Sequence, residues 1–495
     1  MKKEVLSREN FLFAICFFIL MASCFRFSIN TGITASGVLV ISYAEIIGIA
    51  TAIFLGIYIF IRRPKINKDN FICIILTVCF AVFCFPVYLF RTVFHGFELT
   101  SMVIFQATLA VIPLMFLILF NIIPVRIIIK ALTVFSVVLG CVSVILFYNT
   151  LNPIAYTVLS HHMGRTYVLT ALLPISAYQY LLSSKKHWGI CYYIHLGTVV
   201  FCNVASGTRI GVYIVPVIIV MVFLIQIKKN KFSIKYSILA ILVSISLCFI
   251  TAPFYVQMYV NLSRIPVARS VMDVVGIEYS PTVISLEHLD EETIEILRNE
   301  IARGVIDFDR GVTAAEIEYY FAHRRLYVAR NIDVNQANTD MRLDVWREAL
   351  SDISANPLFG IGLRQYNFQA PGFPPRYMTT HNFMLDYALA FGIIGLLLFM
   401  IMTSIPLILA SISKKRTVFK HTAFLLMIPS FLSVMAGAML HTYFLNPSIM
   451  AILYLLIGTY TMLIRCEDIT PNASMVFSTN SDIGFKKNDY TGDDV

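Results

Sequence analysis

Asp340-Met-Arg342-Leu-Asp-Val-Trp346-Arg-Glu348 opens a stretch in which the chain changes from polar to apolar. The stretch continues with Asn356-Pro-Leu-Phe-Gly-Ile-Gly362 and ends with His381-Asn382, nine further residues and Gly392-Ile-Ile-Gly395. A segment that carries arginine and histidine thus leads directly into a long apolar run. Because ionisable groups at the edge or depth of a membrane are costly and usually functional, we expect chemistry at this junction.

The composition is that of an integral membrane protein. Of 495 residues, 58% are hydrophobic and only 14% are charged, and the mean hydropathy is +0.77. A soluble core of this length does not need so much apolar side chain. A membrane-spanning helix needs about 20 mostly apolar residues, and about twelve such runs occur, at 10–25, 37–61, 71–90, 102–123, 127–148, 166–183, 189–206, 209–227, 236–254, 382–410, 421–443 and 447–464.

The connections between these runs alternate in charge. Lysine-rich connections occur at 2–3, 62–68, 126–130, 185–186, 228–235 and 414–420. The positive-inside rule assigns them to the cytoplasm, and the alternation then places both termini there as well. No lysine occurs from Tyr236 to Ser413, so we expect the large polar loop in that interval to face outward. The net charge of +9 follows from these short connections and does not indicate nucleic-acid binding.

We therefore predict an all-α polytopic membrane protein with four parts. Residues 1–254 would form transmembrane helices 1–9, with an uncleaved first helix, and 255–381 a large, mainly helical periplasmic loop. Residues 382–464 would form helices 10–12, and 465–495 a disordered cytoplasmic tail. Of the ten cysteines, none forms a CxxC pair or a Cys/His spacing typical of a metal site. We expect neither a structural metal nor a cofactor.

Three helices are predicted inside the loop. The first follows Asp290, and the second begins with the capping box Thr313-Ala-Ala-Glu316. The third would start near Asp340 as N-cap and end at Asn356-Pro357, since proline disfavours helix in the preceding residue. Its residues Arg342, Trp346, Ala349 and Ile353 are spaced by four, three and four, so they share one face. Arg342 is therefore predicted on the buried side, away from Arg347 and Glu348.

Isolated arginines stand against the charge trend on the predicted outer side, at Arg26, Arg91, Arg165 and Arg209. Arg209 follows Ala205-Ser-Gly-Thr, in a hairpin between two spans that is too short to leave the interface. One interpretation is snorkelling to lipid headgroups. The other is a cationic site for an anionic headgroup, because guanidinium groups bind phosphate through two parallel hydrogen bonds. With Arg342, Arg209 could stabilise a diphosphate leaving group without a divalent cation.

His381 stands at the outer end of the run at 382–410. It is either an interfacial histidine bonded to a loop carbonyl or a general base, or positioner, for an acceptor hydroxyl near neutral pH. Asn382 would orient the ring or bind sugar. Gly392 and Gly395 lie deeper along the run, where we expect them to permit close helix packing. Glu45, inside the second run, has no partner that the sequence identifies.

The combination of Arg342-x3-Trp346, the Asn356–Gly362 motif and His381-Asn382-x9-Gly392-x2-Gly395 resembles the O-antigen ligase/polymerase superfamily of bacterial membrane glycosyltransferases. The resemblance implies a GT-C-like arrangement of helices in the inner membrane with a periplasmic active site. It implies that Arg209, Arg342 and His381 form the catalytic site, with Trp346, Asn382, Arg165 and Arg91 as further substrate-binding candidates. The implied reaction is a metal-independent, inverting transfer of a glycan from undecaprenyl diphosphate.

Two branches of this superfamily fit the motifs. In the ligase branch the acceptor is lipid A-core, and in the polymerase branch it is another lipid-linked repeat unit. The His-Asn-x9-Gly-x2-Gly spacing is the ligase pattern, but Leu396 replaces the small hydroxyl residue often found there, and the loop is long for a ligase. A lipid-linked glycan flippase or transporter is the alternative from another class. The missing two-half repeat and the outward clustering of the polar motifs argue against it.

Overall fold

The computed structural model describes the helical core of the chain and the segments around His381. The described residues are 9–14, 16, 17, 20, 28–34, 37–42, 75, 79, 82, 83, 124–150, 162–183, 185–206, 209–229, 233–253, 258, 262, 265–277, 334–362, 366–368, 376–378, 380–412, 418–439, 453, 455–461 and 463. The predicted loop helices after Asp290 and Thr313, and the tail from 465, lie outside these residues.

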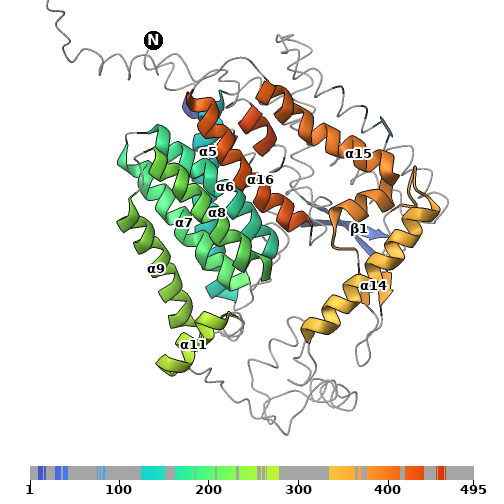
Figure 1. The fold of residues 1–495 in the computed structure, drawn as a ribbon, viewed down its shortest axis with the longest axis horizontal. Helices are drawn as coiled ribbons and strands as arrows, with labels where there is room; N and C mark the ends of the chain where they lie inside the picture. The colour runs from blue at the N-terminus through green and yellow to red at the C-terminus, as the bar shows by residue number, and fades with distance from the viewer. Residues whose placement is uncertain are drawn as a thin grey trace, which may run out of the picture.

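A bundle of long helices forms the core (Figure 1). Its members are α5 (Val125–Thr150), α6 (His162–Leu182), α7 (Lys186–Ser206), α8 (Arg209–Lys228), α9 (Ile234–Thr251) and α16 (Val418–Ala438). Helix α6 contacts α5, α7, α8 and α16, while α9 packs against α7. These helices match six of the predicted apolar runs to within a few residues at each end, which confirms those runs as helices.

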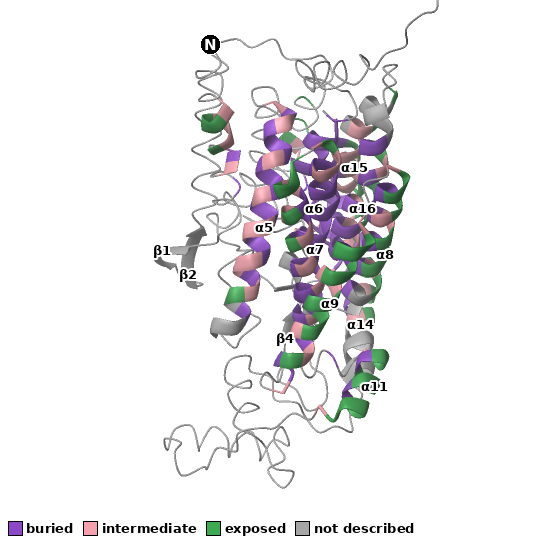
Figure 2. Ribbon diagram, turned by 90° about the vertical axis from the view of Figure 1, so that its left-hand side faces the viewer, coloured by how far each residue is buried: buried purple, intermediate pink, exposed green. Residues whose placement is uncertain are grey.

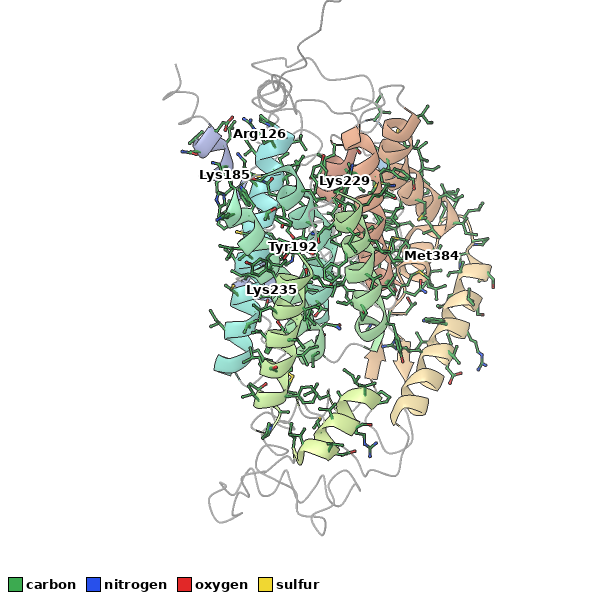
Figure 3. The ribbon with its side chains drawn as sticks, turned by 60° about the vertical axis from the view of Figure 1, so that its left-hand side comes forward. Arg126, Lys185, Tyr192, Lys229, Lys235 and Met384 are labelled. Carbon is green, nitrogen blue, oxygen red and sulfur yellow. The ribbon has the colours of Figure 1, made fainter. Side chains whose placement is uncertain are left out.

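Several basic residues mark one end of the bundle. Arg126, Lys185 and Lys229 lie toward this end, which we call the lysine-bearing end, whereas Lys235 and Met384 lie further along the bundle (Figure 3). Glu9 forms an ion pair with Arg126 and so joins the N-terminal helical residues to this end. The hydroxyl of Thr166 donates to the carbonyl of Cys202 over 3.2 Å. That bond sets the start of α6 beside the end of α7, as the alternating connections predict.

Helix α15 (Phe383–Ile412) lies between the bundle and α14 (Val334–Ala355). Its Phe383, Tyr387 and Phe391 belong to the main hydrophobic core. Ala388 and Leu389, on another side of the same helix, pack with a smaller buried group of three α14 residues, Val345, Ala349 and Ile353. Helix α14 and the short α11 (Pro266–Val275) lie at the end opposite the lysine-bearing end (Figure 2).

The start of α14 differs from the prediction. The helix begins at Val334 rather than near Asp340. No proline or glycine stands between those two positions, so nothing ends the helix there, and Asp340 lies inside it instead of capping it. Its end at Ala355, directly before Asn356-Pro357, is confirmed. Helix α11 was not predicted, although proline at its first position and the left-handed Gly276 after its last are typical boundaries.

Two short antiparallel hairpins stand beside the helices, and the prediction of an all-α chain did not include them. Strands β1 (Ser28–Thr34) and β2 (Gly37–Ser42) pair with each other. Strand β2 occupies the first residues of the run predicted as a span at 37–61, and its β-branched Val38, Val40 and Ile41 suit a strand. Strands β3 (Tyr366–Phe368) and β4 (Arg376–Met378) join α14 to His381, and β3 lies against α14.

Among the described residues, four helices are long and apolar enough to cross a membrane. They comprise Val125–Ile145, Lys186–Ser206, Ile234–Thr251 and Phe383–Ile405. Exposed apolar side chains such as Leu242 and Ile250 cover α9, as expected for a lipid-facing helix. The protein is thus a helical membrane protein, and the remaining predicted spans lie wholly or partly outside the described residues.

Candidate functional site

The Asn356–Gly362 motif docks into a break in α15. At Gly392 the backbone leaves the helical conformation, with φ 70° and ψ −178°. In a regular helix the N–H of Ile393 would donate to the carbonyl of Leu389. Here Ile393 donates to the carbonyl of Pro357 over 2.8 Å instead, and the Leu389 carbonyl accepts from the N–H groups of Ile361 (2.7 Å) and Gly362 (3.1 Å). The loop motif therefore satisfies both backbone groups that the break separates.

Only glycine fits at the two points of closest approach. A side chain on Gly392 would collide with the carbonyl of Leu358, and one on Gly360 with the carbonyl of Leu389. Gly395 is also crowded, because a Cβ there would meet the side chain of Phe391. The prediction that Gly392 and Gly395 permit close packing of helices is not met, because Gly392 approaches the loop backbone and Gly395 the side chain of Phe391 in its own helix.

Trp346 joins the arginine-bearing helix to the segment that carries His381. Its indole Nε1–H donates to the carbonyl of Thr380 over 2.7 Å. Arg342 precedes Trp346 by one helical turn and is half-buried. By contrast, the side chain of Arg347 is 77% exposed and pairs with Asp344 over 2.9 Å. The predicted orientation of Arg342, away from the solvent face, is confirmed, and its helix turn stands next to the His381 segment.

His381 has an unusual backbone. Its φ is 52°, and among the described residues it is the one non-glycine residue with positive φ. Non-glycine residues in this region cost about 1–3 kcal/mol and often lie at functional sites. The residue after it, Asn382, is 7% exposed and caps α15: its side-chain oxygen accepts from the N–H groups of Met384 (3.0 Å) and Leu385 (3.4 Å). His381 is thus held, half-exposed, directly outside the first turn of the helix.

The hairpin that carries Arg209 is as short as predicted. Helix α7 ends at Ser206 and α8 begins at Arg209, at the end of the bundle opposite the lysine-bearing end. Arg165 lies in the first turn of α6 at the same end. The side chains of both arginines lie outside the described residues, as do Arg26, Glu45 and Arg91 in full. The structure bonds Trp346, one helical turn from Arg342, to the residue before His381, and the backbone of Arg209 lies at the same end.

Comparison with known proteins identifies the domain that contains this geometry. Residues 195–400 match the family model of the O-antigen ligase. This part of the chain resembles an O-antigen ligase domain. The match runs from α7 into α15 and includes Arg209, Arg342 and His381, so the resemblance to the O-antigen ligase/polymerase superfamily is confirmed. A search among curated proteins finds no match. The domain is that of bacterial membrane enzymes of the glycosyltransferase type, which act on lipid-linked glycans.

The O-antigen ligase domain contains a buried acid that the sequence analysis missed. Asp386 lies in the first turn of α15, is 2% exposed, and accepts a hydrogen bond of 2.7 Å from the hydroxyl of Thr380. The signal was present, because an acidic residue inside an apolar run is costly unless it has a role. Thr380 itself, directly before the histidine, offered no such signal.

The described residues offer no evident metal site. No three His, Cys, Asp or Glu side chains among them come close enough together to hold an ion. Around the bond between Trp346 and Thr380, the described groups suited to chemistry include the half-buried guanidinium of Arg342, the imidazole of His381 and the hydrogen-bonded Thr380–Asp386 pair. This set suits the binding of an anion and the alignment or deprotonation of a hydroxyl.

Proposed function

We propose that this protein transfers a glycan from undecaprenyl diphosphate to lipid A-core at the periplasmic face of the inner membrane, by a metal-independent, inverting reaction. The observation that carries the proposal is the bond between Trp346 and Thr380. It lies inside the O-antigen ligase domain and sets the helix of Arg342 against the segment of His381. This bond supports the proposal that a cationic group for the donor and a base for the acceptor belong to one site.

The proposed donor site consists of Arg209 and Arg342. Both guanidinium groups would hydrogen-bond to the diphosphate, and their charge would stabilise the leaving undecaprenyl diphosphate as the glycosidic bond breaks. Arg342 suits this role because it is half-buried, and charge–charge attraction is stronger away from bulk water. Arg91 and Arg165 are proposed as further contacts to the same anion, from the same face of the membrane.

The proposed acceptor site centres on His381. Its imidazole would align or deprotonate the attacking hydroxyl on the face of the anomeric carbon opposite the leaving group. Trp346 would pack below Arg342 and support acceptor sugars. Asn382 remains a predicted sugar ligand, but the capping bonds to Met384 and Leu385 engage its side-chain oxygen. Any contact of Asn382 with sugar is therefore expected to use its amide nitrogen.

A repeat-unit polymerase is the second candidate, favoured by two observations. Leu396 follows Gly395 where ligases often have a small hydroxyl residue, and the loop at 255–381 is long. Surface glycan from a deletion strain, separated on a gel, distinguishes the candidates. Core without any O-chain supports the ligase, and core with a single repeat unit supports the polymerase. Lipid-linked glycan that accumulates on the cytoplasmic side instead of the periplasmic side would indicate a flippase and contradict both.

Arg342→Lys is expected to lower glycan transfer at least tenfold. Lysine keeps the positive charge but not the planar fork that binds two phosphate oxygens at once. The measurement is the ratio of O-chain to free core on a gel, with the variant expressed in a deletion strain. Arg347→Lys is the matched control, because Arg347 lies on the same helix with its side chain 77% exposed. Wild-type O-chain in the Arg342→Lys strain would contradict the bidentate role.

A further inference from the structure

The hydroxyl of Thr380 lies at the centre of the hydrogen bonds around His381. Thr380 is 1% exposed. Its Oγ1 lies 2.7 Å from Oδ1 of Asp386, 3.0 Å from the carbonyl oxygen of Asn382, and 3.1 Å from the backbone nitrogen of Asn382, which donates to it. A hydroxyl has one proton to donate, and the carboxyl oxygen of Asp386 is the nearer of its two acceptors. Asp386 thus fixes the direction of this hydroxyl.

The same bonds fix the peptide groups on both sides of His381. Before it, the carbonyl of Thr380 accepts from Trp346 of α14. After it, the N–H of Asn382 donates to the Thr380 hydroxyl that Asp386 orients. Asp386 also donates its own N–H to the carbonyl of Asn382 over 2.9 Å, in the first turn of α15. Between these fixed neighbours, His381 is confined to its positive φ of 52°.

Asp386 has no packing advantage that would explain its presence. It lies in an otherwise apolar helix turn, next to the buried Phe383 and Tyr387. Its second oxygen, Oδ2, is buried and has no hydrogen-bond partner among the described residues. A buried carboxyl oxygen without a hydrogen-bond partner lowers the stability of the fold, whereas an apolar side chain of similar size would not. Its contribution is therefore its hydrogen bonding to Thr380.

We propose that Asp386 is a positioning residue for the transfer reaction, acting through Thr380 to hold the imidazole of His381 at the acceptor site. The proposal rests on the proposed function, because it assumes that His381 contacts the acceptor. Asp386 itself touches neither substrate. Its carboxylate oxygen is needed as a hydrogen-bond acceptor, and its charge is not needed.

Two pairs of variants test the proposal. Asp386→Leu fills the volume but cannot accept a hydrogen bond, whereas Asp386→Asn keeps a carbonyl oxygen at the same place. Thr380→Val and Thr380→Ser form the corresponding pair for the hydroxyl. In a deletion strain we expect Asp386→Leu and Thr380→Val each to lower O-chain on a gel at least tenfold, at unchanged protein amount in the membrane. Asp386→Asn and Thr380→Ser should each retain most of it.

The outcomes separate positioning from other roles. Wild-type O-chain in Asp386→Leu would overturn the proposal, because Asp386 would then have no role in transfer. An equal loss of O-chain in Asp386→Asn and Asp386→Leu would also overturn it, because the charge of Asp386 would then be needed. The double variant Asp386→Leu/Thr380→Val should be no worse than either single one, because both remove the same bond. A multiplied loss in the double variant would also overturn it.

Hydrogen exchange gives a readout that does not depend on the proposed function. In purified protein, amide exchange in the peptide that spans 380–386 should become faster in Asp386→Leu and Thr380→Val, while peptides of α6 and α7 stay unchanged. If amide exchange at 380–386 is unchanged in both variants, the proposal that Asp386 positions His381 is overturned. Normal O-chain in a His381→Ala strain, together with faster exchange in Asp386→Leu, would instead contradict the proposed function and leave the hydrogen-bonded arrangement intact.

Discussion

Replacing His381 is expected to abolish O-chain on the cell surface while the protein remains in the membrane. A positioned base contributes about 10²–10⁴ in rate, so its loss should remove detectable polymer from a gel. Alanine alone would leave an ambiguity, because His381 has a φ of 52° and alanine is strained there. Asparagine tolerates that conformation better than other side chains. His381→Asn should therefore keep the local fold and lose transfer as completely as His381→Ala.

The matched control is a histidine at the lysine-bearing end. His187 lies in the first turn of α7, is exposed, and has its ring tilted against that of Trp188. His187→Ala should leave the O-chain pattern unchanged. Wild-type polymer in the His381→Asn strain would refute the assignment of His381 as base or positioner of the acceptor. If His381→Ala is lost from the membrane and His381→Asn is not, backbone strain explains the effect of alanine, and the effect of asparagine reports on the imidazole.

Hydropathy and helical spacing predicted much of what positions the site. Apolar runs located the bundle helices, because in a membrane each helix must satisfy its own backbone and present apolar side chains to lipid. The four- and three-residue spacing of Arg342, Trp346 and Ala349 predicted that they share a face, and Ala349 is fully buried there. The role of Trp346 as a hydrogen-bond donor to Thr380 is beyond such reasoning, since its partner is 34 residues away.

Other features depend on contacts that no local pattern encodes. The left-handed backbone of His381 requires Thr380, Asn382 and Trp346 together, and none of these residue types indicates positive φ in its neighbour. Asp386 could have been noticed as an acid in an apolar run, but its partner could not. The hairpin of β1 and β2 was missed because a continuous apolar run does not distinguish a strand from the start of a helix.

The two glycine-containing motifs form one structural unit, and this is the point at which a single methyl group should have its largest effect. Gly392→Ala is expected to destabilise the protein by at least about 3 kcal/mol. The conformation at φ 70° and ψ −178° is nearly restricted to glycine and costs other residues about 1–3 kcal/mol. A Cβ would also push Leu358 away, and the bonds of Ile393 and Ile361 across the break are each worth about 1 kcal/mol.

Gly276 provides the control that separates conformation from collision. It has the same φ of 70°, with ψ 34°, and a Cβ there meets nothing within 4 Å. Gly276→Ala should therefore cost only about 1 kcal/mol and leave O-chain unchanged.

Gly360→Ala, whose Cβ would lie 2.6 Å from the nitrogen of Gly392, should resemble Gly392→Ala. The measurements are thermal stability in detergent and O-chain on a gel. Equal losses at Gly276 and Gly392 would mean that backbone strain explains both. A larger loss at Gly392 and Gly360 together would mean that the transferase needs the loop motif seated in the broken helix, because that seating fixes α14, and hence Arg342, relative to His381.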